Sequence, residues 1–263
     1  MTGVQTCALP ISASKTREIT SGAEASGKDY TAEGVRGLAA LTVFFAHFGL
    51  CFFPNGFNTL YPGLQTSPAP DGAIEAFLRT PLLTLLWNGN FAVCIFFVLS
   101  GFVLSKPYYA GNQIETLRDR YLKRYLRLSV PIAASVLLGY ALMRAGLLTS
   151  AAAAELSHSD WLKAYWSFPP SLVGALQDAA YRVIFLGEFR FNPPLWTMKI
   201  EFIGSLITFA FYALMPAGSA WRKALHYTIA IVSIGVFTQR EAIFYYAFLL
   251  GGVLWSLPRP EGR

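Results

Sequence analysis

Long apolar segments dominate this sequence and limit what it can fold into. Residues 34–53 read GVRGLAALTVFFAHFGLCFF, and further apolar segments follow along the chain. A helix needs roughly 20 mostly apolar residues to cross the hydrocarbon core of a bilayer. Several of these segments approach that length. The sequence therefore predicts an all-α fold, a polytopic transmembrane helical bundle.

The composition supports the same class. Hydrophobic residues make up 54% of the 263 residues and charged residues only 14%, and the mean hydropathy is +0.43. A soluble domain usually has about a quarter of its residues charged. The net charge of +6 suits a membrane protein, because cytoplasmic loops collect Lys and Arg. No basic stretch is interleaved with aromatic residues in a polar domain, so we expect no nucleic-acid partner.

The apolar segments predict about six spans. They cover residues 36–53, 85–105, 130–149, 195–215, 223–238 and 242–257. The stretch between the second and third spans carries six basic residues, whereas the first loop, 54–84, contains only Arg79. Because basic loops stay in the cytoplasm, we expect a multi-pass protein of the cell inner (plasma) membrane with a cytoplasmic N-terminus.

The first residues differ in character from the rest of the chain. The stretch MTGVQTCALPIS matches the translation of a sequencing-library adapter, so we interpret residues 1–11 as an assembly artefact. Residues 13–30 are small and polar, as is typical of a disordered tail. We therefore expect a tail over 1–30 and an incomplete transmembrane domain over 31–263. The three cysteines, Cys7, Cys51 and Cys94, show no metal-binding spacing, and we predict no metal site.

Arg36 and His47 stand out because ionisable residues inside a span are costly and point to function. They lie eleven positions apart, so at 100° per residue both fall within about 20° of one helical face. The helical rise separates them by about 16 Å, which places His47 near the middle of the membrane if Arg36 lies at its inner boundary. Imidazole titrates near neutral pH, so His47 could act as a general base or nucleophile. It could also simply bond a neighbouring helix.

Glu201 is a third ionisable residue inside a predicted span, within NPPLWTMKIEFIGSLITF at 192–209. A carboxylate there must pair with a cation or stay protonated. Lys199 is two residues away and faces another side of the helix, so it cannot be the partner. Two interpretations stay open: a structural ion pair with another helix, or a carboxylate that orients a catalytic group.

Basic residues recur at helical spacing across 118–129, opposite a face of Tyr and Leu: Arg120, Lys123, Arg124 and Arg127. This pattern predicts an amphipathic helix on the inner membrane surface. It would either hold anionic lipid or bind the phosphate groups of a cytoplasmic ligand, which Arg contacts with two parallel hydrogen bonds. In the second span, Ser100 and Gly101 favour close packing of helices.

Four segments, in this order along the chain, resemble the acyltransferase-3 family of integral membrane acyltransferases. They are RGLAALTVFFAH at 36–47, FFVLSGFVLS at 96–105, LKRYLRLSVP at 122–131 and PLWTMKIEFIGSL at 194–206. The resemblance implies a fold of roughly ten spans of about 20 residues each, so the six present here would form an incomplete acyltransferase domain.

The resemblance also implies a reaction. An acyl group, often acetyl, passes from cytoplasmic acyl-CoA to a hydroxyl of an extracytoplasmic carbohydrate or related envelope acceptor. His47 would carry the chemistry with Arg36 in support, and Glu201 is the third catalytic candidate. Arg124 and Arg127 would contact the coenzyme, and we add Arg120 and Ser100 as candidates for the same site. Membrane lipid is the other expected partner.

Two other functions stay open at this point. A proton-coupled transporter or flippase of envelope precursors also uses intramembrane His, Glu and Arg. It would commonly contain an inverted repeat with interrupted helices, and the sequence shows no such internal similarity. A non-catalytic sensor or assembly subunit could hold anionic lipid through its basic segment. That function does not explain why Arg36 and His47 lie on one face of the helix.

Overall fold

The structure, a computed structural model, describes residues 30–62, 72–109 and 114–257, and for 114–122 only the backbone. Every regular element in these ranges is helical, so the all-α prediction is confirmed for them. The adapter-like segment and the predicted tail, except for Tyr30, lie outside the described residues.

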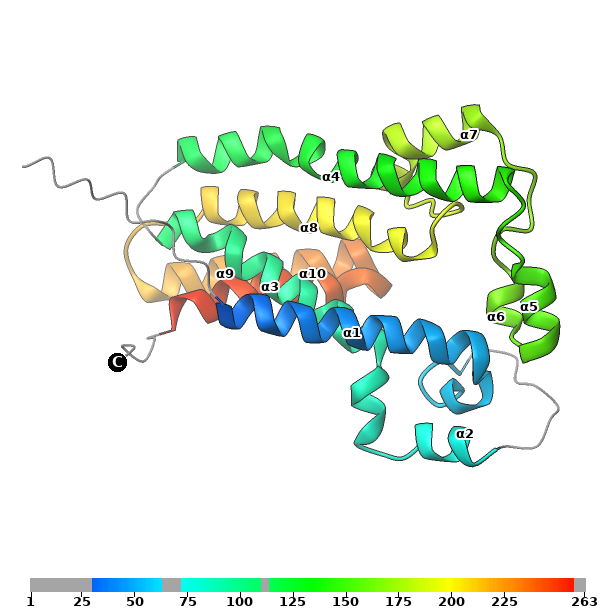
Figure 1. The fold of residues 1–263 in the computed structure, drawn as a ribbon. Helices are drawn as coiled ribbons and strands as arrows, with labels where there is room; N and C mark the ends of the chain where they lie inside the picture. Colours follow the sequence, from blue (N-terminus) through cyan, green and yellow to red (C-terminus); the bar gives the residue numbers. More distant parts are fainter. Residues whose placement is uncertain (1–29, 63–71, 110–113, 258–263) are drawn as a thin grey trace, which may run out of the picture.

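Six helices of 15 residues or more form the bundle (Figure 1). They are α1 (Tyr30–Phe52), α3 (Gly89–Tyr109), α4 (Ile114–Arg144), α8 (Trp196–Ala213), α9 (Ala220–Thr238) and α10 (Ala242–Ser256). All except α4 begin and end within six residues of a predicted segment. Three of the six, namely α1, α3 and the part of α4 from Lys123 to Arg144, are long and apolar enough to cross a membrane. The count of six spans stays a prediction.

The long helix α4 corrects the prediction of an amphipathic helix on the membrane surface over 118–129. That segment continues through Pro131 into the apolar part of the same helix. Arg124 is buried, and its side chain bonds Ser205 and Glu201 of α8, which lies alongside α4 (Figure 1). The prediction was wrong because the pattern within one segment does not reveal a buried partner on another helix.

Shorter elements gather at the end of the bundle where α1 finishes (Figure 1). The sequence interpretation placed most of both contributing stretches in loops, 54–84 and 150–194. The first stretch forms η1 (Pro54–Phe57), α2 (Ala73–Leu78) and η2 (Leu83–Trp87). The second forms α5 (Ser150–Ser157), α6 (Asp160–Lys163), α7 (Leu172–Gln177), the π-helix η3 (Asp178–Leu186) and η4 (Pro193–Leu195).

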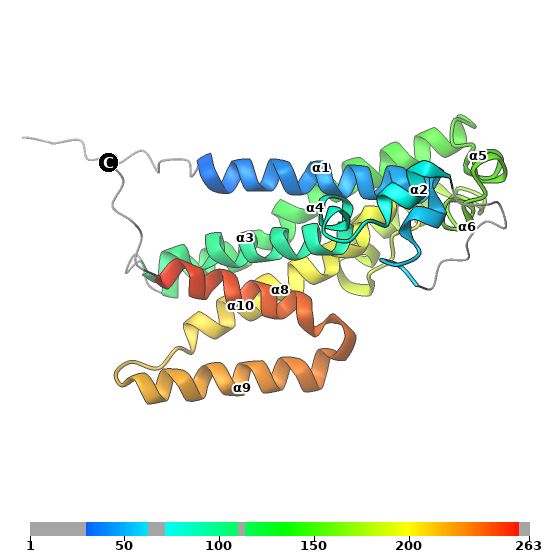
Figure 2. The same cartoon turned by 90° about the horizontal axis from the view of Figure 1, so that it is seen from below.

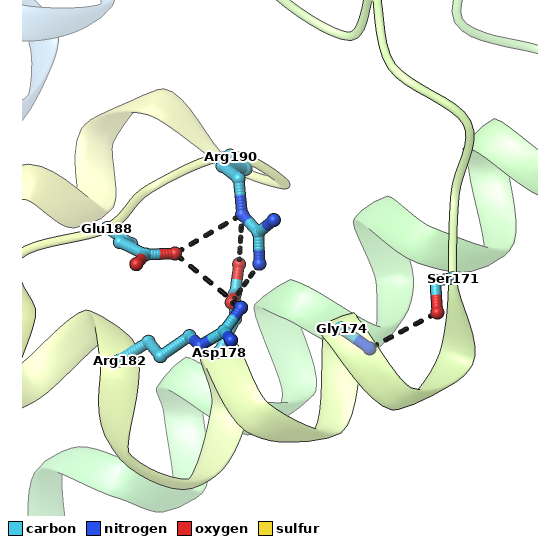
Figure 3. A network of polar contacts seen from close by, with 6 residues as sticks. All are labelled: Ser171, Gly174, Asp178, Arg182, Glu188 and Arg190. Carbon is cyan, nitrogen blue, oxygen red and sulfur yellow. Dashed lines mark hydrogen bonds and ion pairs between the residues drawn. The ribbon is translucent and has the colours of Figure 1, made fainter.

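Two polar anchors hold the short elements at this end, one of them on the long helix α1. The Ser159 hydroxyl caps α6 by accepting the Leu162 N–H, and it donates to the carbonyl of Leu50 in α1 at 2.6 Å. Figure 3 shows the second anchor: buried Asp178 accepts two hydrogen bonds from Arg190, at 2.6 and 3.2 Å. This anchor holds the turn that leads from η3 into η4 and α8.

Close contact between α3 and α10 forms the centre of the bundle, with α9 at its edge beyond α10 (Figure 2). A Cβ atom on Gly101 would lie 2.0 Å from the carbonyl oxygen of Phe248, and one on Gly251 would lie 2.0 Å from that of Val98. The two backbones therefore touch where each helix carries glycine, which is how small residues let membrane helices approach. The small residue predicted to favour packing at position 101 does so here.

Replacing Gly101 with alanine should destabilise the protein by about 1–3 kcal/mol, because the added methyl group forces the α3 and α10 backbones apart. Gly37→Ala is the matched control, since nothing lies within 4 Å of a Cβ at that position of α1. Thermal unfolding of the detergent-solubilised variants measures the difference. Equal melting temperatures for the two variants would contradict the packing described here.

Candidate active site

An ion pair joins three helices in the middle of the bundle. Arg124 of α4 donates through Nη2 to Oε1 of Glu201 in α8, and through Nε to the Ser205 hydroxyl at 3.0 Å. Ser100 of α3 donates to the same Glu201 oxygen at 2.9 Å. Both charged groups are largely removed from solvent. A buried carboxylate and guanidinium in this arrangement compensate each other's lost hydration. Arg124 is thus the cation on another helix that the structural interpretation of Glu201 requires.

The same pair lines a basic cavity of about 430 Å³. Four cationic side chains contribute to its wall: Arg36, Lys123, Arg124 and Arg127. Ser100 and Glu201 also line it, so five of the predicted site residues surround one space. Arg36 also pairs with Glu33 at 2.7 Å, and its side chain keeps 39% exposure. A cavity with this excess of positive charge suits a ligand that carries several phosphate groups.

His47 has one ring nitrogen committed and one available. Its Nδ1 lies 2.7 Å from the carbonyl oxygen of Val43, one turn earlier in α1. A carbonyl oxygen only accepts, so Nδ1 carries the proton and Nε2 of the neutral ring keeps its lone pair. The backbone of α1 thus holds the histidine in the tautomer that a general base requires.

Two cavities border His47. An apolar one of about 300 Å³ lies between α1, α3 and α8 and includes Phe96, Phe97 and Met198 in its wall. It also shares Ser100 and Glu201 with the basic cavity. The other, of about 110 Å³, lies toward the end of the bundle where the short helices gather, called the capped end below. The three cavities adjoin one another through shared residues, and they run from the basic cluster past Glu201 to His47.

Arg36 and His47 therefore lie on the same side of α1. The basic cavity that contains Arg36 and the apolar cavity that contains His47 both have α3 and α8 residues as their other walls. This is the arrangement expected from their spacing of eleven residues. Neither side chain points away from the bundle, although α1 exposes other large residues such as Phe44 and Phe45.

Aromatic residues surround the small cavity beside His47: Tyr61, Trp161, Tyr165 and Trp196. The rings of His47 and Trp161 are 5.6 Å apart between centroids, and those of Trp161 and Tyr165 are 4.8 Å apart. Burial raises the pKa of the Tyr61 and Tyr165 phenols above the ordinary value, so both remain hydrogen-bond donors at neutral pH.

Sequence reasoning missed this aromatic wall. The aromatic residues of the loops 54–84 and 150–194 fit either an interfacial belt or a sugar-facing surface. The sequence could not tell which of them lie beside His47. Ser205 was also missed as a partner of Arg124, because it lies one turn beyond Glu201 and no single-helix pattern marks it. Of the predicted residues, Arg120 lies in the part of α4 whose side chains the structure does not describe.

Comparison with known proteins gives the family of the chain. The model of the acyltransferase domain matches residues 29–262, which is most of the chain. The chain belongs to the acyltransferase-3 family. The resemblance of the four sequence segments is confirmed, and both of the relatives described next are named acyltransferases.

Two curated relatives of this acyltransferase-3 chain are fungal proteins. Acyltransferase clz18 from Cochliobolus lunatus is 22% identical over 84% of this chain and 56% of its own length. Acyltransferase R4 from Phoma sp. shows the same identity and the same coverage. The chain thus spans about half the length of the curated relatives it matches. No solved structure matches it.

The buried pair should dominate the stability of this acyltransferase-3 chain. Glu201→Ala leaves Arg124 buried without a counter-charge, which should cost about 3–5 kcal/mol. Arg127→Met is the matched control, because Arg127 is exposed and such changes stay within about ±0.5 kcal/mol. The double variant Arg124→Met/Glu201→Leu should recover most of the loss. Thermal unfolding in detergent measures all three, and a Glu201→Ala variant as stable as Arg127→Met would contradict the prediction.

The same double variant separates the two interpretations of Glu201. If Glu201 orients catalytic groups as well as joining the helices, the double variant should be stable but inactive in acyl transfer. Wild-type transfer by a stable double variant would leave Glu201 with a structural role alone.

Proposed function

We propose that the protein moves an acyl group, most simply acetyl, from cytoplasmic acyl-CoA to a hydroxyl of an extracytoplasmic carbohydrate or related cell-envelope acceptor. The N-terminus and the basic cavity would face the cytoplasm of a cell inner (plasma) membrane, with lipid around the bundle. The observation that carries the proposal is the line of adjoining cavities, from four cationic side chains at one end to His47 and aromatic rings at the other.

The basic cavity supports coenzyme A as the donor. Coenzyme A carries phosphate groups at one end and a thioester at the far end of a long flexible arm. Arg36, Arg124 and Arg127 supply planar guanidinium groups that bind phosphate with paired hydrogen bonds. The rise along α1 from Arg36 to His47 is about 16 Å, a length that an extended thioester arm can span through the apolar cavity.

His47 then acts as the general base. Its Nε2 takes the proton of the acceptor hydroxyl, and the oxygen attacks the thioester carbonyl carbon. A new C–O bond forms, the C–S bond breaks, and the proton held on His47 passes to the departing thiolate. The Nδ1 hydrogen bond to Val43 keeps the ring oriented while its charge changes.

The aromatic wall supports a carbohydrate acceptor. Trp161, Tyr165 and Trp196 line the small cavity at the capped end, beside the histidine. Aromatic faces pack against the apolar C–H faces of sugar rings, while phenol hydroxyls bond to sugar oxygens. The acceptor would enter from the side of the short helices, opposite to the coenzyme.

His47→Asn should reduce kcat by about 10²- to 10⁴-fold, the usual contribution of a general base. His158→Asn is the matched control: His158 is exposed and holds a left-handed backbone with φ of 53°, which asparagine tolerates. Membrane vesicles that contain each variant receive labelled acetyl-CoA, and label in envelope carbohydrate is counted. Equal transfer by His47→Asn and wild type would overturn the role of His47, and solute uptake without transfer would favour a transporter.

Arg127→Met should raise KM for acetyl-CoA by about ten- to a hundred-fold, since a hydrogen bond to a charged group contributes about 1.5–3 kcal/mol. The effect should shrink when the donor is S-acetylpantetheine, which has no phosphate for the guanidinium to bind. KM is measured for both donors with the wild type and with Arg127→Met, and the effect of the substitution is compared between the two donors. An equal penalty with both donors would contradict phosphate recognition by this cavity.

A further inference from the structure

Tyr61 occupies a position in the His47 cavity that neither the sequence patterns nor the proposed base mechanism uses. It follows η1 in the stretch between α1 and α3 and lines the 110 Å³ cavity together with the histidine. Its ring stacks beside that of Phe57, with centroids 6.5 Å apart, and packs against the cluster of Ala46, Leu50 and Phe57. The phenol is therefore held in place by α1, the helix that carries His47.

The hydroxyl of Tyr61 meets the beginning of α3. The phenol oxygen lies beside the backbone of Gly89 and Asn90. Their N–H groups are among the first of a 21-residue helix, and such groups have no partner within their own helix. A Cβ on Gly89 would lie 3.1 Å from both the Tyr61 oxygen and Ala46 Cβ, so the hydroxyl and the residue before His47 border the same position of α3.

This arrangement leaves the proton of the hydroxyl for the cavity. Backbone N–H groups only donate, so toward the start of α3 the phenol can act only as an acceptor, and its own O–H is left to donate elsewhere. The positive end of the α3 dipole also polarises the O–H bond and makes it a stronger donor. Burial keeps the pKa of Tyr61 above its ordinary value, which ensures that the proton is present at neutral pH.

We propose that Tyr61 is a further catalytic residue, whose hydroxyl donates a hydrogen bond to the oxyanion that forms when the acceptor attacks the thioester beside His47. The inference rests on the proposed acyl transfer. In that step the carbonyl oxygen gains negative charge as the C–O bond forms, and it returns to a neutral carbonyl when the C–S bond breaks. Tyr61 keeps its proton throughout, while His47 carries the transferred proton. Donors fixed in advance at such an oxygen are among the largest contributions to catalysis.

Tyr61→Phe removes only the hydroxyl and tests the inference. The kcat should fall about 100-fold with KM for both substrates within about twofold, because the bond exists only in the transition state. Tyr246→Phe is the matched control, since its phenol donates to the Ile231 carbonyl on another helix, outside the cavities around His47. A rise in KM for the acceptor with unchanged kcat would assign Tyr61 to binding and overturn the proposal.

A double-mutant cycle with Gly89→Ala separates catalysis from folding. The new methyl group presses on the Tyr61 hydroxyl, so it should lower kcat about tenfold or more in the wild-type background and much less in the Tyr61→Phe background. Equal effects in both backgrounds would show that the methyl group acts only through packing against Ala46, and would overturn the role of the hydroxyl. Absence of transfer by the wild type with any acyl-CoA would instead refute the proposed function itself.

Discussion

A carboxylate and a guanidinium that leave water must find each other, and in this bundle Glu201 of α8 and Arg124 of α4 do so with help from Ser100 and Ser205. Their pairing sets the distance between α3, α4 and α8, because each of the three helices contributes a polar group to one cluster. Replacing such a cluster by apolar packing often stabilises a protein. Here the cluster also lies at the junction of two cavities, both of which Ser100 and Glu201 line.

The cavities that adjoin around this cluster form one path with two chemically different ends. Cationic side chains gather on one side of Glu201, and the histidine with its aromatic neighbours lies on the other. The long helices α1, α3, α4 and α8 provide the path, while short elements close the histidine end. The network of Asp178 and Arg190 (Figure 3) and the cap at Ser159 keep those short elements, and so the aromatic wall, in place.

The periodicity and hydropathy of single segments were enough to predict the helical class, five helices within six residues of their ends, and the common side of Arg36 and His47. These features depend on local sequence alone. Partnerships between helices could not be predicted this way: Arg124 was assigned to a surface helix, whereas it pairs with Glu201 inside the bundle. Tyr61 and Trp161 come from segments far apart in sequence, and only the fold brings both to the His47 cavity.

In the proposed mechanism, an acyl-CoA molecule extends along the path from the basic cavity to His47. A structure of the protein with a non-reactive acyl-CoA analogue, in which the thioester sulfur is replaced by CH₂, tests this most directly. We expect phosphate groups against Arg36, Arg124 and Arg127, and the analogue's carbonyl group beside the imidazole of His47 with its oxygen directed to the Tyr61 hydroxyl. Phosphates bound elsewhere, or a carbonyl group that does not enter the cavities beside His47, would contradict it.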